Sequence, residues 1–260
     1  MPAAAHDKTR IPRTKIAELL KRIKRADSVE VKVVVPMSAH AATIKSIGMD
    51  PLDAEPRQVF FFDTPNLDLY KHGLMVRARR IQGGGGDSVV KLRPMDPDNV
   101  REELRRSDRF KIEIDAIPGG FVCSGSFSRR CSAQQVLDAA DRKTRLSSLL
   151  SKGQCRFFKE HAPRTIGNKT KMNSLLTLGP LFVLKGKLKP KKLARGLTVE
   201  LWLFPDGSRN LEVSTKCMPN EAFTAAEELR TFLDARGVEI ANGQETKTAA
   251  AMKFFAAHRR

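Results

Sequence analysis

The sequence predicts an α+β fold in which antiparallel strands close into a barrel with a charged interior, flanked by helices. Three observations support this prediction. Several β-rich segments carry ionisable side chains at alternate positions, so each strand has one apolar face and one charged face. Turns rich in glycine, proline and aspartate join some of these segments into hairpins. Amphipathic helices are available to cover the apolar faces from outside.

Eight segments have the composition of strands, because they are short runs of β-branched and apolar residues bounded by turn residues. The first of them ends at Pro36, and the glycines of residues 83–86 form the tip of a hairpin. A second hairpin turns at residues 205–208. In chain order, the predicted strands are residues 28–35, 57–63, 74–81, 87–93, 109–117, 175–187, 197–204 and 209–217.

Between these strands, several segments have apolar residues at the spacing of a helix. The predicted helices are residues 14–25, 38–47, 67–72 (a short turn), 132–152, 220–236 and 246–258. No internal repeat and no clear domain boundary interrupts the pattern. We therefore expect a basic N-terminal segment and helix over residues 1–27. A single tunnel-like domain follows over residues 28–258, with a basic helical and loop insertion at about 132–195.

Charge is unevenly distributed along the chain. There are 47 Lys and Arg against 29 Asp and Glu, a net charge of +18. Residues 1–25 contribute +6 and residues 156–195 contribute +10, which leaves +2 for the remainder. This excess favours a polyanionic partner, which could be a phosphate-rich small molecule, an acidic membrane surface or nucleic acid. With one Trp, one Tyr and no recognition motif, nucleic acid is the less favoured partner.

Several functional classes are disfavoured by composition. No stretch approaches the roughly 18 to 20 apolar residues of a membrane span, and residues 1–25 lack the apolar core of a secretory signal. The four cysteines form no CxxC pair, so a zinc site is not expected. We expect a cytoplasmic protein with reduced thiols.

Six predicted strands place long ionisable side chains on one face. These side chains are Glu30 with Lys32, Arg77 with Arg79, Lys91 with Arg93, Glu113 with Asp115, Glu200, and Glu212. One such face is ordinarily a solvated outer surface. Six of them together predict a common bore, whose charges require water, a metal ion or a polyanion. Arg and Lys match phosphate oxygens, and carboxylates bind Mg²⁺ or Mn²⁺, so a triphosphate is a guest of suitable size.

An ordered set of motifs resembles the CYTH domain, or triphosphate tunnel metalloenzyme, superfamily. Val29-Glu-Val-Lys32 resembles its ExExK strand, and Gly73-Leu-Met-Val-Arg-Ala-Arg-Arg80 resembles a following strand. Val90-Lys-Leu-Arg93 lies where the family has a Lys-x-Arg strand, and the hairpin with Glu200 and Glu212 lies where it has late acidic strands. The resemblance covers about residues 28–255, apart from 153–195.

The resemblance implies an eight-stranded antiparallel tunnel and a cytoplasmic enzyme or binding module that uses Mg²⁺ or Mn²⁺. Glu30, Lys32 and Glu212 would take part in catalysis. The phosphate-binding residues would be Lys32, Arg77, Arg79, Lys91, Arg93, Arg195 and Lys247. The metal ligands would be Glu30, Glu113, Glu200 and Glu212, with Asp115 as a compensating carboxylate.

Two departures from the family pattern concern the metal end of the tunnel. Ser28 stands where the family has the first Glu of ExExK, and Ser214 stands where a second late Glu is usual.

The leading expectation is metal-dependent hydrolysis of an inorganic, organic or nucleoside triphosphate. The alternatives are an adenylate cyclase of the class IV type, a triphosphate- or polyphosphate-binding module without turnover, and a nucleic-acid-binding protein. The identity of the triphosphate and the oligomeric state are left open.

Overall fold

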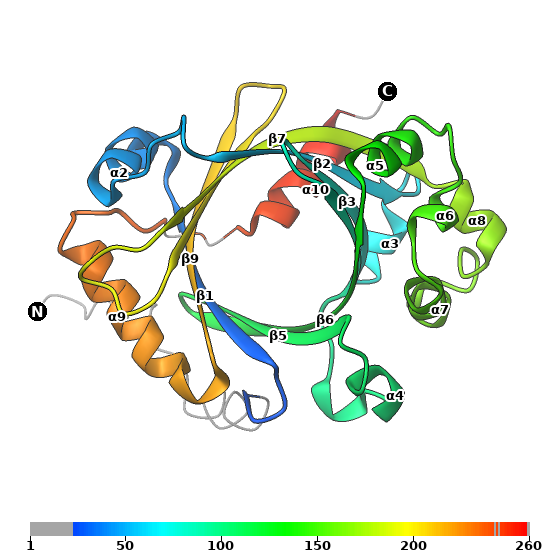
Figure 1. The fold of residues 1–260 in the computed structure, drawn as a ribbon, viewed down its shortest axis with the longest axis horizontal. Helices are drawn as coiled ribbons and strands as arrows, with labels where there is room; N and C mark the ends of the chain where they lie inside the picture. Colours follow the sequence, from blue (N-terminus) through cyan, green and yellow to red (C-terminus); the bar gives the residue numbers. More distant parts are fainter. Residues whose placement is uncertain (1–22, 242, 244, 259–260) are drawn as a thin grey trace, which may run out of the picture.

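A computed structural model of the chain describes residues 23–241, 243 and 245–258 (Figure 1). Nine strands form one closed barrel in the order β1-β5-β6-β4-β3-β2-β7-β8-β9. Their bounds are β1 (Ser28–Val35), β2 (Glu55–Asp63), β3 (Leu74–Ile81), β4 (Gly86–Leu92), β5 (Phe110–Ile117), β6 (Gly120–Cys131), β7 (Leu176–Leu188), β8 (Leu197–Leu203) and β9 (Arg209–Cys217). All eight segments predicted as strands are strands.

The predicted barrel of eight antiparallel strands was wrong in its count, because it omitted β6. This strand pairs with β4 on one side and β5 on the other. A closed ring of strictly antiparallel neighbours requires an even number of strands, so a ring of nine must contain a parallel pair. That pair is β1 with β5, while the other neighbours are antiparallel.

Helices cover the outside of the barrel and enclose the main hydrophobic core. Helix α5 packs against β3 and β4, α7 packs against β4 and β6, and α9 packs against β9 and β1. All three helices lie outside the ring of strands in Figure 1. The helices are α2 (His40–Ile47), α3 (Asp68–Lys71), α4 (Glu102–Arg105), α5 (Ala133–Ala140), α6 (Leu146–Leu149), α7 (Lys152–His161), α8 (Lys169–Asn173), α9 (Ala222–Asp234) and α10 (Lys247–Ala257). Among the described residues, no helix combines the length and apolarity that crossing a membrane requires.

The single helix predicted over residues 132–152 is divided into α5, α6 and the start of α7. Helix α5 ends just before Arg142, whose φ of 59° is left-handed and cannot continue a helix. Helix α7 begins anew at Lys152, after the N-cap Ser151, whose side chain accepts a hydrogen bond from the amide of Gln154 in a capping box. The predicted helix over residues 14–25 lies outside the described residues except for its last three.

Helix α10 lies on the inner side of the barrel wall (Figure 1). A second apolar cluster joins it to inward-facing residues of β2, β7 and β8: Val59, Phe61, Leu181, Val183 and Trp202 pack with Ala251 and Met252. Part of the interior is therefore a packed core. The charged side chains occupy the space that remains.

Candidate active site in the barrel bore

The barrel encloses a cavity of about 900 Å³. Its lining has nine basic and five acidic side chains, an excess of four positive charges with histidine neutral. The basic side chains are Lys32, Lys71, Arg77, Arg79, Lys91, Arg93, Lys185, Lys216 and Lys247, and the acidic ones are Glu30, Glu113, Asp115, Glu200 and Glu212. The charged strand faces predicted from alternation therefore meet in one space.

The structure does not bring Arg195 to this cavity. Its guanidinium pairs with Glu221 at 3.0 Å and with Glu228, which tie the loop after β7 to α9 on the outside of the barrel. Every other residue predicted to act in the site lines the bore. An arginine in a charged loop has no alternation pattern to orient it, which explains why the sequence misplaced this one.

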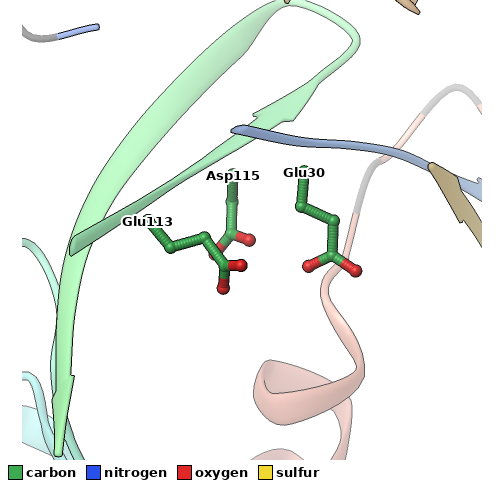
Figure 2. A group of neighbouring side chains, drawn as sticks. All are labelled: Glu30, Glu113 and Asp115. Atoms are coloured by element: carbon green, nitrogen blue, oxygen red, sulfur yellow. The ribbon is translucent and has the colours of Figure 1, made fainter. Parts of the chain in front are cut away.

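Three carboxylates converge on one side of the bore, as Figure 2 shows. Each of these residues, Glu30, Glu113 and Asp115, has a carboxylate oxygen that lies within 4.8 Å of those of the other two. The parallel pairing of β1 and β5 places Glu30 opposite Asp115 and Ser28 opposite Glu113. The carboxylate of Asp115 is 1% exposed, and its two oxygens lie 2.7 Å from Lys32 Nζ and 3.0 Å from Arg93 Nη2. Clustered carboxylate oxygens of this kind fit a divalent cation such as Mg²⁺ or Mn²⁺.

Lys32 provides positive charge at the centre of the acidic groups. Its Nζ lies 2.7 Å from Glu30 Oε2, 2.7 Å from Asp115 Oδ1 and 3.8 Å from Glu212 Oε1. Burial alone would lower the pKa of Lys32, but the carboxylates of Glu212, Asp115 and Glu30 outweigh burial and raise it. Burial would raise the pKa of Asp115, but Lys91, Lys32 and Arg93 outweigh it and hold that pKa far below its usual range. Both groups are thus charged at neutral pH.

Glu200 and Glu212 form a second acidic pair, directly opposite each other on β8 and β9. Lys247, at the start of α10, contacts Glu200 and lies 2.8 Å from Glu212 Oε1. Lys185 Nζ lies 3.3 Å from Glu200 Oε1. The five carboxylates predicted as metal ligands are therefore divided, with three in the cluster and two held together by lysine.

Arg77 differs from its neighbours in having no carboxylate partner. Arg79 pairs with Asp87 through Nε and Nη2, the latter at 2.6 Å, and Arg93 Nη2 lies 3.0 Å from Asp115 Oδ2. No salt bridge joins Arg77 to a carboxylate of the described residues, and burial together with nearby Arg79 lowers the pKa of Arg77. An arginine remains protonated at neutral pH in spite of such a shift. Arg77 therefore brings a planar guanidinium without a carboxylate partner among the described residues into the bore.

The two serines that replace expected carboxylates occupy polar positions at the acidic cluster. Ser214 Oγ donates a hydrogen bond to Glu30 Oε1 at 3.0 Å, so it orients a cluster carboxylate without adding charge. Ser28 is buried, and its register partner is Glu113. The predicted compensation by Asp115 agrees with this arrangement, since Asp115 supplies the third carboxylate.

Sequence reasoning did not assign three lysines of the bore to the site, namely Lys71, Lys185 and Lys216. Lys216 pairs with Glu113 at 2.7 Å, and its shared face with Glu212 was the signal that could have found it. Lys185 follows two apolar residues, Leu181 and Val183, on the inner face of β7. The same strand thus contributes to both the packed core and the charged bore, and no simple alternation of charge marks it.

Comparison with known proteins identifies the fold. No family model and no curated protein matches the chain. A solved structure from Bacillus halodurans, described as a candidate adenylate cyclase, matches with a TM-score of 0.59 and 13% identity, over 86% of this chain and 97% of that one. A candidate adenylyl cyclase from Hippeastrum, described as having a dominant triphosphatase activity, matches with a TM-score of 0.63 and 17% identity, over 86% of this chain and 94% of that one. At these identities the matches show that the chain shares the barrel fold of the two structures.

Proposed function

We propose that this chain hydrolyses a triphosphate inside the bore with the help of Mg²⁺ or Mn²⁺. The observation that carries the proposal is the surplus of four basic over acidic side chains in the lining, which includes Arg77 without a carboxylate partner among the described residues, beside a cluster of three carboxylates. A triphosphate carries roughly four negative charges, so the surplus of basic side chains would offset charge on such a substrate. A bore that bound only metal ions would have no need of nine basic side chains.

The basic residues have distinct tasks in this proposal. Arg77, Arg79 and Arg93 hold phosphate oxygens through their forked donors, and Lys32, Lys91 and Lys247 add point charges. Phosphoryl transfer needs chiefly positioning and charge stabilisation, and these groups supply both. Because most of them also contact carboxylates, they are fixed in place before the substrate arrives.

The acidic residues orient and activate water. Glu30, Glu113 and Asp115 would hold the metal ion, which neutralises charge on phosphate oxygens and favours ionisation of water. Glu212 Oε2 is buried and has no hydrogen-bond partner among the described residues, so it can accept a proton from the attacking water. Water adds to the terminal phosphorus, and the bond from that phosphorus to the bridging oxygen breaks. The products are orthophosphate and the shortened diphosphate chain, which keeps the bridging oxygen.

A phosphate-release assay tests the proposal. The purified chain is incubated with inorganic triphosphate, ATP or thiamine triphosphate, with Mg²⁺ or Mn²⁺, and orthophosphate is measured. We expect metal-dependent release that Glu113→Gln lowers at least about 100-fold, because a ligand is lost. The matched control is Glu221→Gln, which removes a carboxylate outside the bore and leaves the rate unchanged.

Other products would support the alternatives. Cyclic AMP formed from ATP in place of orthophosphate would identify a cyclase, the activity named for both structural neighbours. Saturable binding of inorganic triphosphate in calorimetry without any turnover would identify a binding module. Either result would overturn the hydrolase proposal.

A further inference from the structure

One mouth of the bore has a different chemistry from its centre. The lining there includes Tyr70, Met75 and Pro94 in addition to the charged residues. Tyr70 is the single tyrosine of the chain, and it is 37% exposed. A half-exposed aromatic ring at the edge of a polar cavity is suited to stack on a planar organic group.

The position of Tyr70 is fixed by the backbone around it. The buried carboxylate of Asp63 accepts hydrogen bonds from the amides of Leu69 at 2.9 Å and Tyr70 at 3.0 Å, which anchors the short helix α3 to the end of β2. Fixing these amides limits the movement of the Tyr70 backbone. The backbone that carries Tyr70 is therefore held in place before a ligand arrives.

The same mouth adjoins the phosphate-binding residues. Gly73 O accepts a hydrogen bond from Arg93 N at 2.8 Å, and Arg93 pairs in turn with Asp115 of the acidic cluster. This approach requires glycine, because Gly73 has a φ of +74° and a Cβ there would lie 2.3 Å from Arg93 O. The tyrosine-bearing corner is thus held directly beside the charged centre.

The size of the cavity also exceeds what a bare phosphate chain uses. Its volume of about 900 Å³ lies near the upper end of the roughly 300 to 1,000 Å³ of pockets for drug-sized organic ligands. We propose that Tyr70 is a specificity-determining residue, whose ring stacks on the base of a nucleoside triphosphate while the phosphates lie in the bore. This inference rests on the proposed function and adds a substrate class to it.

The test compares two substrates in one set of variants. KM and kcat are measured for ATP and for inorganic triphosphate with Mn²⁺, in the wild type, Tyr70→Ala, Tyr70→Phe and Phe223→Ala. Phe223 is an exposed aromatic residue of α9 outside the cavity lining, so its variant is the control. We expect Tyr70→Ala to raise KM for ATP about tenfold, in line with the loss of one stacked base, with KM for inorganic triphosphate changed less than twofold. Tyr70→Phe should behave as the wild type.

The outcomes separate this inference from the proposed function. Equal changes for both substrates, or no change for either, would overturn the role of Tyr70 while leaving hydrolysis intact. If the wild type hydrolyses neither of these substrates nor thiamine triphosphate, the proposed function fails. Calorimetry with ATP and inorganic triphosphate in the same variants then decides the stacking role, because a tenfold loss of affinity confined to ATP supports it and any other pattern rejects it.

Discussion

At the scale of single residues, alternation along β3 separates two arginines with different tasks. Arg77 faces the bore without a carboxylate partner among the described residues, whereas Arg80 bonds Gln58 Oε1 at 2.9 Å and is absent from the cavity lining. Both side chains are long and positively charged, so composition cannot distinguish them. Their positions along the strand can distinguish them, because residues an odd number apart point to opposite faces of the sheet. The sequence therefore sufficed to place Arg77 in the bore.

Removal of the Arg77 charge should weaken substrate binding without weakening the fold. Arg77→Met takes away a cation that is buried beside Arg79, so repulsion and desolvation are relieved and the melting temperature should stay equal or rise. Inorganic triphosphate should bind about 10- to 100-fold less tightly, because a charge-assisted hydrogen bond is worth about 1.5 to 3 kcal/mol. Isothermal calorimetry and thermal unfolding measure the two effects.

The matched variant is Arg80→Met, which removes an equal charge from the other face of the same strand. It should leave affinity for inorganic triphosphate within about twofold of the wild type, since long-range attraction is screened. Equal losses in the two variants would show that net charge, rather than the position of Arg77, governs binding.

At the scale of elements, strands with regular alternation could be predicted and β6 could not. The residues of β6 include two glycines, three serines and two cysteines, which have neither the β-branched composition nor the charge pattern of the other strands. Their small size has a structural reason that only the assembled barrel shows. Ser126 is the register partner of Lys91, and Gly125 lies under Met95 and Phe110. Packing against neighbours, rather than local propensity, selects these residues.

The acidic site, like the strands, could be predicted from the sequence only in part. Glu30, Glu113 and Asp115 could each be assigned to an inner face by alternation, but their convergence depends on β1 pairing with β5 in parallel. That contact joins segments far apart in the chain, and it is the single parallel pair that a closed ring of nine strands contains here. The separation of Glu200 and Glu212 from the cluster likewise depends on Lys247, which α10 brings into the bore. Long-range arrangements of this kind leave no local pattern.

The packing of β6 leads to a prediction about stability. In Gly125→Ala, the added Cβ would lie 2.1 Å from Met95 Sδ and 2.8 Å from Phe110 Cζ. Such overpacking should lower the free energy of unfolding by about 1 to 3 kcal/mol, as measured by urea denaturation. Gly120→Ala on the same strand is the control, because its Cβ would meet nothing within 4 Å. An equal loss in both variants would assign the effect to backbone freedom and not to packing.

At the scale of the whole molecule, the barrel is held together partly by buried ion pairs whose members are far apart in the chain. Lys32 on β1 contacts Asp115 on β5, and Lys247 on α10 contacts Glu212 on β9. Each pair is favourable only while both partners are charged, because a buried charge without its partner is strongly destabilising. The stability of the fold should therefore depend on pH.

The direction of this dependence follows from the pKa shift of Asp115. Its pKa in the folded protein lies far below the value of about 4 in an unfolded chain, because Lys91, Lys32 and Arg93 outweigh burial. The carboxylate therefore stabilises the fold above about pH 4, and this contribution is lost as the pH falls through the folded pKa. We expect the free energy of unfolding, measured by urea denaturation with a chelator present, to fall steeply below pH 4.

Substitution of Asp115 tests whether this residue carries the effect. Asp115→Asn should be less stable than the wild type by about 2 to 3 kcal/mol at pH 7, the contribution of one carboxylate with a strongly lowered pKa, and its loss of stability in acid should be smaller. Asp141→Asn, which changes a surface carboxylate paired with Lys143, should keep the acid dependence of the wild type. If Asp115→Asn and the wild type lose stability in parallel between pH 4 and pH 2, the acid sensitivity arises elsewhere and the pairing of Asp115 is not its source.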